Sequence, residues 1–247
     1  MIRLDQALVD RGLCESRERA KRVILAGQVR VNNQHAHKPS DLIKSDDALA
    51  LDAGEKYVSR GGHKLEHALR HFELNVTGLV VLDLGASTGG FTDCLLQHGA
   101  AKVFAVDVGQ GQFAWKLRQD RRVVVMEKTN ARYLTAAQFP QPFAPADLAV
   151  IDCSFISLRK ILPAAIALLK SDGKIIALIK PQFEAGKAEA DKGRGVITDP
   201  SVHKQVLKKM SEFVASQTGL NWRGVVESPL LGPAGNKEFL VLIEKKH

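Results

Sequence analysis

The feature that most constrains this chain is a glycine-rich turn that directly follows a short apolar run. Residues 80–92 have the sequence VVLDLGASTGGFT, which predicts a strand, a tight turn and the start of a helix. A turn of this kind brings backbone N–H groups close to a ligand at the N-terminus of the helix. A dinucleotide-binding fingerprint that begins at Gly85 requires glycine at position 87, where this chain has Ser87, so the pattern disfavours NAD.

Further short apolar runs alternate with helical patterns along the rest of the chain. Their almost continuous apolar character is typical of strands buried on both faces, which predicts an α/β fold with a mostly parallel sheet. A helical pattern with Leu65, Ala68 and Leu69 on one face precedes the first run, and Pro200 suits the first turn of another helix. The predicted strands cover residues 80–82, 103–106, 123–126, 148–151, 175–179, 222–226 and 239–243.

The composition excludes several classes of protein. With 247 residues, 45% apolar and 25% charged, the chain can bury a full core and is unlike disordered, collagenous or coiled-coil proteins. Its net charge of +8 favours a polyanionic partner such as nucleic acid. Three scattered cysteines without a Cys-x-x-Cys pattern predict no disulfide framework, no metal site and a cytoplasmic location. No signal-peptide pattern and no apolar stretch near the ~20 residues of a membrane helix is found, so we expect no membrane association.

The first part of the chain predicts a small, basic domain. Leu4, Ala7 and Leu8 recur at helical spacing, and Ser16 is placed to cap a second, densely basic helix that Gly27 ends. The next residues alternate like a strand that runs into an Asn-Asn turn. The sequence therefore predicts a domain at 1–58, a glycine-containing linker at 59–63 and a second domain at 64–247.

Three segments of this small domain resemble the ribosomal-protein-S-four-like RNA-binding module. They are Arg3-Leu4-Asp5, Ser16-Arg17 and residues 26–32. The resemblance implies a small α/β domain that binds RNA, and guanidinium groups on one helix face suit an RNA phosphate backbone. The alternative is a basic helix face that is only solvated. The predicted RNA-binding side chains of this domain are Arg3, Arg17, Arg19, Lys21, Arg22 and Arg30.

The glycine turn also matches a family pattern. The spacing Asp-x-Gly-x-x-x-Gly-Gly, from Asp83 to Gly90, resembles the first motif of class I S-adenosylmethionine-dependent methyltransferases. The resemblance implies a Rossmann-like fold with seven strands, the last antiparallel, and places Asp83 near the methionyl amine of the cofactor. Asp107, 22 residues after Gly85, is placed to accept hydrogen bonds from both ribose hydroxyls, and Asn130 lies where family members contact the adenine. The alternative for both aspartates is ordinary turn and capping chemistry. The predicted cofactor-binding residues are Asp83, Gly85, Ser87, Thr88, Gly89, Gly90, Phe91, Asp107 and Asn130.

Four charged residues are expected to meet at the edge of the sheet where the parallel strands have their carboxyl ends. Asp152 and Lys180 directly follow predicted strands, Glu238 precedes the last strand, and Lys64 opens the helix that runs back to the first. Ligands gather at this edge in doubly wound sheets. The four residues match the Lys-Asp-Lys-Glu tetrad of the RrmJ/FtsJ-like ribose 2′-O-methyltransferases. With its N-terminal module, the chain resembles the TlyA (hemolysin A-like) ribosomal RNA 2′-O-methyltransferases.

The chemistry of the reaction suggests a hypothesis for the role of each residue of the tetrad. A ribose hydroxyl is a poor nucleophile, so the enzyme must mainly align the attack and ease the loss of the proton. We expect Lys180 to act as the base or to stabilise the developing alkoxide, and Lys64 to orient the ribose or a phosphate. Asp152 and Glu238 would hold the two ammonium groups in place. Taken singly, each residue has an ordinary alternative as a solvated or edge-paired charge.

Outside these motifs the sequence predicts further RNA contacts and leaves alternatives open. The segment 184–196 is too polar for a core and is expected to face RNA, a solvated loop being the alternative. Phe155, Trp115 and Trp222 are candidates for stacking on an extruded base, although aromatics more often pack in the core. The expected partners are ribosomal RNA or ribosomal subunits, with a cytidine as target and no obligate protein partner. Other hypotheses are a cell-lysing protein, suggested by the family's hemolysin name, and a non-catalytic ribosome- or RNA-binding factor. The additional predicted RNA-binding residues are Arg60, Lys187, Lys192 and Arg194.

Overall fold

The computed structural model describes residues 1–52, 55–186, 189 and 193–245. It divides the chain into two compact units, residues 1–56 and residues 57–247, which are described separately below. Among the described residues, no helix has both the length and the apolar character needed to cross a membrane.

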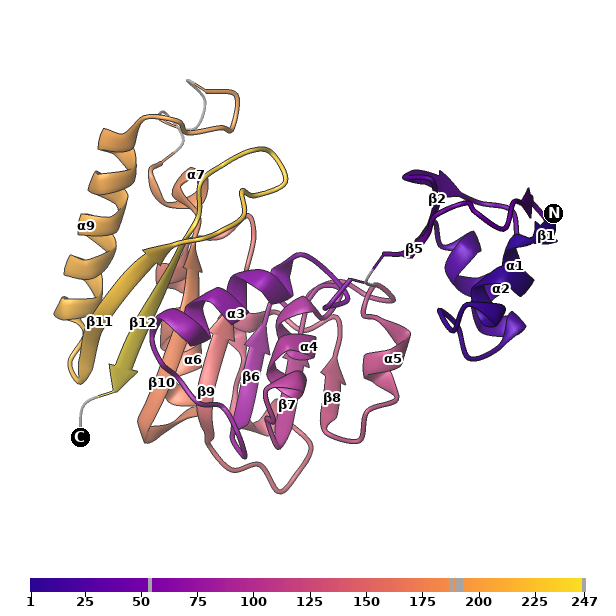
Figure 1. The fold of residues 1–247 in the computed structure, drawn as a ribbon. Coiled ribbons are helices and arrows are strands. Elements are labelled where there is room, and N and C mark those ends of the chain that lie inside the picture. The colour runs from indigo at the N-terminus through magenta and orange to yellow at the C-terminus, as the bar shows by residue number, and fades with distance from the viewer. Residues whose placement is uncertain (53–54, 187–188, 190–192, 246–247) are drawn as a thin grey trace. The chain divides into compact units, whose positions relative to one another are not determined.

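The N-terminal unit packs two helices against short antiparallel strands (Figure 1). As predicted, the Ser16 hydroxyl caps the second helix by accepting a hydrogen bond from the Arg19 N–H at 3.3 Å. Asn32 and Asn33 both have positive φ and form the turn between the second and third strands. The elements are β1 (Ile2–Arg3), α1 (Leu4–Asp10), α2 (Arg17–Leu25), β2 (Val29–Val31), β3 (Gln34–Ala36), β4 (Leu42–Ile43) and β5 (Leu49–Leu51).

The C-terminal unit is built on a seven-stranded sheet with the order β11-β12-β10-β9-β6-β7-β8. Strand β12 runs antiparallel to both of its neighbours, and the other strands are parallel to one another, which confirms the predicted fold. The strands are β6 (Val80–Leu84), β7 (Lys102–Val106), β8 (Val123–Met126), β9 (Ala146–Ile151), β10 (Leu169–Ile179), β11 (Leu220–Glu227) and β12 (Phe239–Lys245).

Helices cover both faces of this sheet, and the strands therefore bury both sets of side chains. In β9, Leu148 and Val150 pack on the side of α3 and α4, whereas Ala149 and Ile151 pack on the side of α6 and α9. Figure 1 shows α3 and α4 lying across one face. The apolar runs in the sequence are nearly continuous because both faces are dry. The helices are α3 (Gly61–His71), α4 (Gly90–Gln97), α5 (Trp115–Arg118), α6 (Leu162–Ala167), α7 (Pro181–Glu184) and α9 (Pro200–Ser216), with short 3₁₀ turns η1 (Ala131–Tyr133), η2 (Ala136–Gln138) and η3 (Leu158–Lys160).

Two boundaries differ from the sequence prediction. Helix α3 begins at Gly61, inside the predicted linker. A side chain at Gly62 would meet the buried ring of Tyr57 at 2.2 Å, so this position needs glycine for close packing within the second unit rather than for a flexible joint. Strand β10 begins at Leu169, earlier than predicted, with an irregular register between Leu169 and Lys174.

Candidate active site at the carboxyl edge of the sheet

The four charged residues predicted to converge do so, as two ion pairs. The Lys180 ammonium lies 2.6 Å from Asp152 Oδ1, and Lys64 Nζ donates to Glu238 Oε2 at 2.5 Å. Asp152 and Lys180 directly follow β9 and β10, Glu238 directly precedes the antiparallel β12, and Lys64 lies in the first turn of α3. Topology therefore brings all four side chains to one edge, although 174 residues separate Lys64 from Glu238.

The pairs are largely withdrawn from water. Lys64 is 7% exposed, Lys180 is 8% exposed and Glu238 is 1% exposed. Burying a lone ammonium or carboxylate is costly, so each buried charge needs its partner. Gly232 closes over one pair, since a Cβ at this position would lie 2.6 Å from Glu238 Oε1. The site therefore holds two lysines at the carboxyl edge of the sheet, and each positive charge is balanced by a carboxylate.

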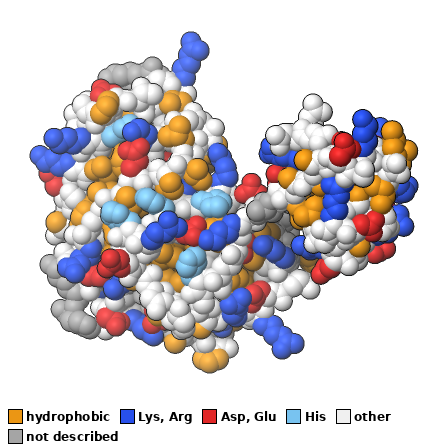
Figure 2. Space-filling view, in the orientation of Figure 1, with side chains coloured by type: hydrophobic (Ala, Val, Ile, Leu, Met, Phe, Trp, Pro, Cys, Tyr) orange, Lys and Arg blue, Asp and Glu red, His pale blue; other side chains and the backbone are white. Residues whose placement is uncertain are grey.

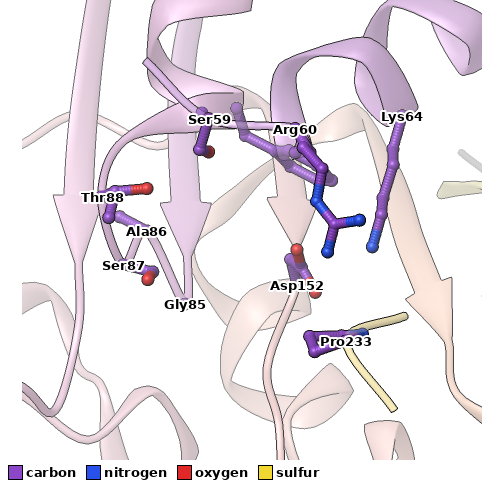
Figure 3. A pocket seen from close by; sticks show the side chains of 12 residues that line it. Ser59, Arg60, Lys64, Gly85, Ala86, Ser87, Thr88, Asp152 and Pro233 are labelled. Atoms are coloured by element: carbon purple, nitrogen blue, oxygen red, sulfur yellow. The ribbon is translucent and has the colours of Figure 1, made fainter. Parts of the chain in front are cut away.

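Two cavities flank the glycine turn and meet at Asp152. The larger, of about 480 Å³, is lined by Gly85, Ser87, Asp107, Asn130 and the loop after β9. The smaller, of about 230 Å³, has the Arg60 and Lys64 side chains reaching toward Asp152 on one side and the glycine turn on the other (Figure 3). Its lining includes Ser59, Gly85, Ser87, Thr88, Gly90, Phe91 and Pro233.

The glycine turn touches the tetrad directly. Gly85 has a φ of +88°, and a Cβ there would lie 2.7 Å from the Asp152 carbonyl oxygen. Only glycine lets the turn approach the end of β9 this closely. A molecule lying along the turn therefore reaches Asp152 without crossing any intervening side chain. Gly89 lines neither of these cavities. Glycine is required there for packing, because a Cβ at this position would lie 2.4 Å from the Leu117 side chain.

Asp107 faces the larger cavity and is held in a fixed orientation. Its Oδ2 accepts from the Ser87 N–H at 2.8 Å, and its Oδ1 accepts from the Gly109 N–H at 2.7 Å and from Gln112 Nε2 at 3.1 Å. Asn130 lines the same cavity, while its Oδ1 caps η1 by accepting from the Arg132 N–H at 3.0 Å. Asp107 thus binds backbone N–H groups of nearby turns, which was the alternative to ligand binding, and also lies on the cavity wall.

Asp83 lies elsewhere, beneath the turn. It is fully buried and lines neither cavity; its Oδ2 accepts from the Thr92 hydroxyl at 2.6 Å, and its Oδ1 has no hydrogen-bond partner among the described residues. Burial, and then the nearby negative charge of Asp152, raise the pKa of Asp83 to about 7. The residue is positioned to respond to positive charge near the turn rather than to bind a ligand by direct contact in this arrangement.

A third cavity, of about 350 Å³, lies on the other side of the tetrad. Lys180 and Glu238 form part of its wall, together with the aromatic rings of Phe155 and Phe183, whose centroids are 5.3 Å apart. Phe155 is 91% exposed with a φ of +63°, unlike a core aromatic, whereas Trp222 packs against the core as its alternative predicted. Trp115 is also exposed, but it lies on α5.

Sequence reasoning missed three polar residues of this edge. Ser154 accepts a hydrogen bond from Lys180 at 2.8 Å, Gln182 lines the third cavity, and the buried Asn236 holds the chain at Ile197 and Gly195. All three stand within or beside the segments that carry the tetrad residues. These three residues could have been found from the sequence by their nearness to Asp152, Lys180 and Glu238.

The predicted RNA-binding arginines of the N-terminal unit are exposed, apart from the half-buried Arg30, and some are anchored by carboxylates. Arg3 and Arg17 both bind the buried carboxylate of Asp5, at 3.0 Å, with their side chains 46% exposed. Arg30 pairs with Asp52 at 3.0 Å. Figure 2 shows Lys and Arg side chains on the visible face of this unit. Arg19, Lys21 and Arg22 are exposed on α2, Arg60 lines the smaller cavity, Arg194 is exposed, and Lys187 and Lys192 lie outside the described residues.

Comparisons with known proteins agree with this architecture. Residues 57–245 match the model of the FtsJ-like methyltransferases, and residues 2–49 match the S4 domain. The chain is 51% identical to YqxC of Bacillus subtilis, over 97% of this chain and 84% of that protein. It is 46% identical to the 16S/23S rRNA (cytidine-2′-O)-methyltransferase TlyA of Mycobacterium tuberculosis, over 97% of this chain and 88% of that protein.

A solved structure gives the same result. A Streptococcus thermophilus protein that carries the hemolysin name superposes with a TM-score of 0.74 at 46% identity, covering 99% of this chain and 88% of that chain. Family models account for both units, and the relatives match along nearly the whole length. The chain therefore belongs to the FtsJ-like methyltransferases and, within them, to the family of TlyA and YqxC.

Proposed function

We propose that this protein transfers a methyl group from S-adenosylmethionine to a ribose 2′-hydroxyl of ribosomal RNA, with a cytidine as the target. The observation that carries the proposal is the pairing of Lys180 with Asp152 and of Lys64 with Glu238 at one edge of the sheet. The relative TlyA is named for the same reaction on 16S and 23S rRNA, and it is 46% identical to this chain. We propose accordingly that it acts in the cytoplasm, where ribosomal RNA is found.

The larger cavity fits the proposed cofactor. Within the protein the Asp107 carboxylate accepts three hydrogen bonds, two on Oδ1 and one on Oδ2, and so keeps about one of its roughly four lone-pair sites, on Oδ2, for a ribose hydroxyl. A second ribose hydroxyl would take the place of the Gln112 amide on Oδ1. Val108, Ala131 and Ile156 provide an apolar surface for an adenine ring, and the cavity leads along Gly85 to Asp152. When bound, S-adenosylmethionine supplies a methyl group already activated by a sulfonium. The fully buried Asp83 adds negative charge beneath the turn, which favours a cationic ligand.

The residues of the edge would then act on the RNA. Lys180 faces the third cavity, where we place the target nucleotide, and its amine lies close enough to the cofactor side to align the 2′-oxygen with the methyl group. As the bond between the 2′-oxygen and the methyl carbon forms, the carbon–sulfur bond breaks. The hydroxyl proton goes either to Lys180 in its neutral amine form, or to solvent while the Lys180 ammonium stabilises the oxygen. Lys64, held by Glu238, orients the ribose or its phosphate. The lining by Phe155 and Phe183 suits an extruded base.

The N-terminal unit would hold the RNA. Its exposed arginines contact phosphates, and Asp5 fixes the direction of Arg3 and Arg17. We propose the same role for Arg60 at the smaller cavity and for the predicted lysines of segment 184–196. Because phosphate contacts release counterions, binding should weaken steeply as salt is raised.

The experiment is methyl transfer from labelled S-adenosylmethionine to isolated 30S and 50S ribosomal subunits. The proposal predicts incorporation into RNA of at least one subunit. Binding of the cofactor without transfer to either subunit would favour the alternative of a non-catalytic ribosome-binding factor. Lysis of red cells by purified protein, at equal rate with and without cofactor, would favour the cell-lysing alternative that the hemolysin name of one structural relative suggests.

A further inference from the structure

Ser154 stands at the boundary between the proposed cofactor and nucleotide cavities. It is exposed and lines both the 480 Å³ cavity and the 350 Å³ cavity. It lies in the loop after β9, two residues beyond Asp152 and directly before Phe155. A side chain at this place is close to where the methyl group would pass from the cofactor to the ribose oxygen.

The Ser154 hydroxyl is bound to the central lysine. Lys180 Nζ donates to Ser154 Oγ at 2.8 Å and lies 2.6 Å from Asp152 Oδ1. Both partners come from one loop, so the ammonium is held by one segment of the chain through an ion pair and a hydrogen bond. The ion pair holds the ammonium in place, and the hydrogen bond to Ser154 fixes the direction of one N–H bond. Because the four bonds of the nitrogen are tetrahedral, this also sets the directions of the other two N–H bonds.

The two partners are chemically different. Asp152 supplies a negative charge, whereas Ser154 supplies a neutral acceptor that sets direction and leaves the charge balance unchanged. A lysine side chain has four rotatable bonds, and a single ion pair restrains its end only loosely. Near the cavity mouth a freely turning amine would often point away from the ribose hydroxyl.

We propose that Ser154 is a positioning residue for the methyl transfer: together with Asp152 it directs the amine of Lys180 toward the ribose hydroxyl. This inference rests on the proposed function. It assigns no covalent step to Ser154, which acts only through Lys180. The proton and the methyl group move as described for Lys180 above.

The test compares Ser154→Ala with Ser154→Thr in the full-length protein. Misplacing a reacting group by about 1 Å costs up to about 100-fold in rate, so kcat should fall about 10- to 100-fold in the alanine variant. The KM for ribosomal subunits and the Kd for S-adenosylmethionine should change by less than about threefold, because binding surfaces are kept. The threonine variant keeps the hydroxyl and should recover most of kcat.

Ser157→Ala is the matched control. It removes a hydroxyl from the same loop that donates to Glu184 at 2.7 Å and accepts from the Arg159 N–H at 3.3 Å. Within the described part of the chain this hydroxyl has no hydrogen bond with Lys180, which donates to Ser154 instead. Its melting temperature should fall while kcat stays near the wild-type value. Equal losses of kcat in the Ser154→Ala and Ser157→Ala variants would overturn the proposal, because the loop as a whole would then be responsible.

A measurement without turnover completes the test. In the protein alone, the ¹⁵Nζ–H signal of Lys180 should be protected from exchange with water, and Ser154→Ala should speed that exchange while Ser157→Ala leaves it unchanged. Unchanged exchange in Ser154→Ala would overturn the inference. If the wild-type protein itself transfers no methyl group to RNA, the proposed function fails. If it does and Ser154→Ala retains full kcat, only the role of Ser154 fails.

Discussion

Two aspartates, one in each unit, lack exposed surface, and their pKa values are shifted in opposite directions. They are Asp5 and Asp83, of which Asp83 lies deeper in the protein. Hydrogen bonds from Arg3 and then from Arg17 lower the pKa of Asp5 to about 2 against the cost of burial. Among the described side chains, the Thr92 hydroxyl alone donates a hydrogen bond to Asp83, and burial raises the pKa of Asp83 to about 7. Arginines that bind a carboxyl group without exposed surface hold its pKa low, whereas burial raises the pKa of one that no described cation binds.

The difference separates two uses of a buried carboxylate. In the N-terminal unit Asp5 has its cations built in, and these hold two guanidinium groups at the surface in a fixed direction. Beneath the glycine turn Asp83 has no built-in cation among the described residues, so the turn is complementary to a positively charged ligand. The tetrad resembles the first case, since each of its carboxylates is paired with a lysine.

The largest expected effect is on kcat and follows removal of Lys180, the cation that we propose acts on the ribose hydroxyl. Lys180→Ala should lower kcat about 10²- to 10⁴-fold, the usual contribution of a positioned acid or base. The Kd for S-adenosylmethionine should stay near the wild-type value, because Lys180 is not part of the larger cavity. Turnover is measured with labelled cofactor, and Kd by titration calorimetry. A loss of cofactor affinity as large as the loss of kcat would contradict this division of roles.

Removing the carboxylate of the Lys64–Glu238 ion pair should lower the stability of the protein, because it leaves a buried charge without its partner. Glu238→Ala leaves the Lys64 ammonium buried without a partner and should lower the free energy of unfolding by about 3–5 kcal/mol. The double variant Lys64→Met/Glu238→Leu removes both charges and should recover most of that stability without recovering activity. Denaturant unfolding curves measure this. If the double variant is no more stable than Glu238→Ala, the pair does not act as a charge-balanced unit.

Neutralising the aspartate that has no cation should have the opposite sign. Because the folded-state pKa of Asp83 is raised, its favourable contribution is present below about pH 4 and is lost as the pH rises to about 7. Asp83→Asn should therefore become more stable than the wild type as the pH rises, by up to about 4 kcal/mol. Thermal and denaturant unfolding between pH 5 and pH 8 test this.

The same variant tests the link between Asp83 and a cationic ligand. Wild-type affinity for S-adenosylmethionine should increase as the pH passes about 7, because a bound cation favours the ionised carboxylate. In Asp83→Asn the affinity should be lower at pH 8 and should no longer depend on pH in this range. If the affinity for S-adenosylmethionine has the same pH profile in both proteins, Asp83 does not stabilise a bound cation.

The smallest effect is expected at the carboxylate with built-in cations. The pKa of Asp5 is lowered, so its contribution to stability is present above about pH 4 and is lost as the pH falls toward about 2. Asp5→Asn should remove that pH dependence and weaken RNA binding several-fold, because Arg3 and Arg17 lose their anchor. Filter binding to ribosomal RNA measures the affinity.

Arg19→Gln is the control for the N-terminal unit. Arg19 pairs only at 3.9 Å with the exposed Glu15, so its loss should change stability by less than about 0.5 kcal/mol. RNA affinity should fall by one phosphate contact and its salt dependence should decrease accordingly. An effect of Asp5→Asn on RNA binding no larger than that of Arg19→Gln would show that anchoring of the arginines is unimportant.

The sheet and the convergence of the tetrad were predictable because both follow from chain order. Apolar runs mark the strands, parallel strands share one carboxyl edge, and residues that follow Ile151 and Ile179 must therefore lie together. The N-cap at Ser16 was predictable for a related reason, since its hydrogen bond to Arg19 spans only three residues.

Contacts that depend on side-chain packing between distant elements were not predictable. Nothing in the sequence indicates that Asp5 binds Arg17, that Asp83 turns to Thr92 rather than into a cavity, or that Lys180 selects Ser154. Helix α3 was predicted, but its start at Gly61 was placed three residues too late, because Gly61 and Gly62 were interpreted as part of a linker, whereas Gly62 serves close packing against Tyr57. Local glycine patterns do not distinguish these two uses.

The most direct test of the central claim is the position of the transferred methyl group. Ribosomal RNA that has been methylated with labelled cofactor is hydrolysed in alkali, which cleaves every phosphodiester that has a free 2′-hydroxyl beside it. The account predicts that the label is found in an alkali-resistant dinucleotide beginning with cytidine, and that Lys180→Ala yields none. Label in ordinary mononucleotides would place the methyl group on a base, and would contradict the assignment of the tetrad to ribose chemistry.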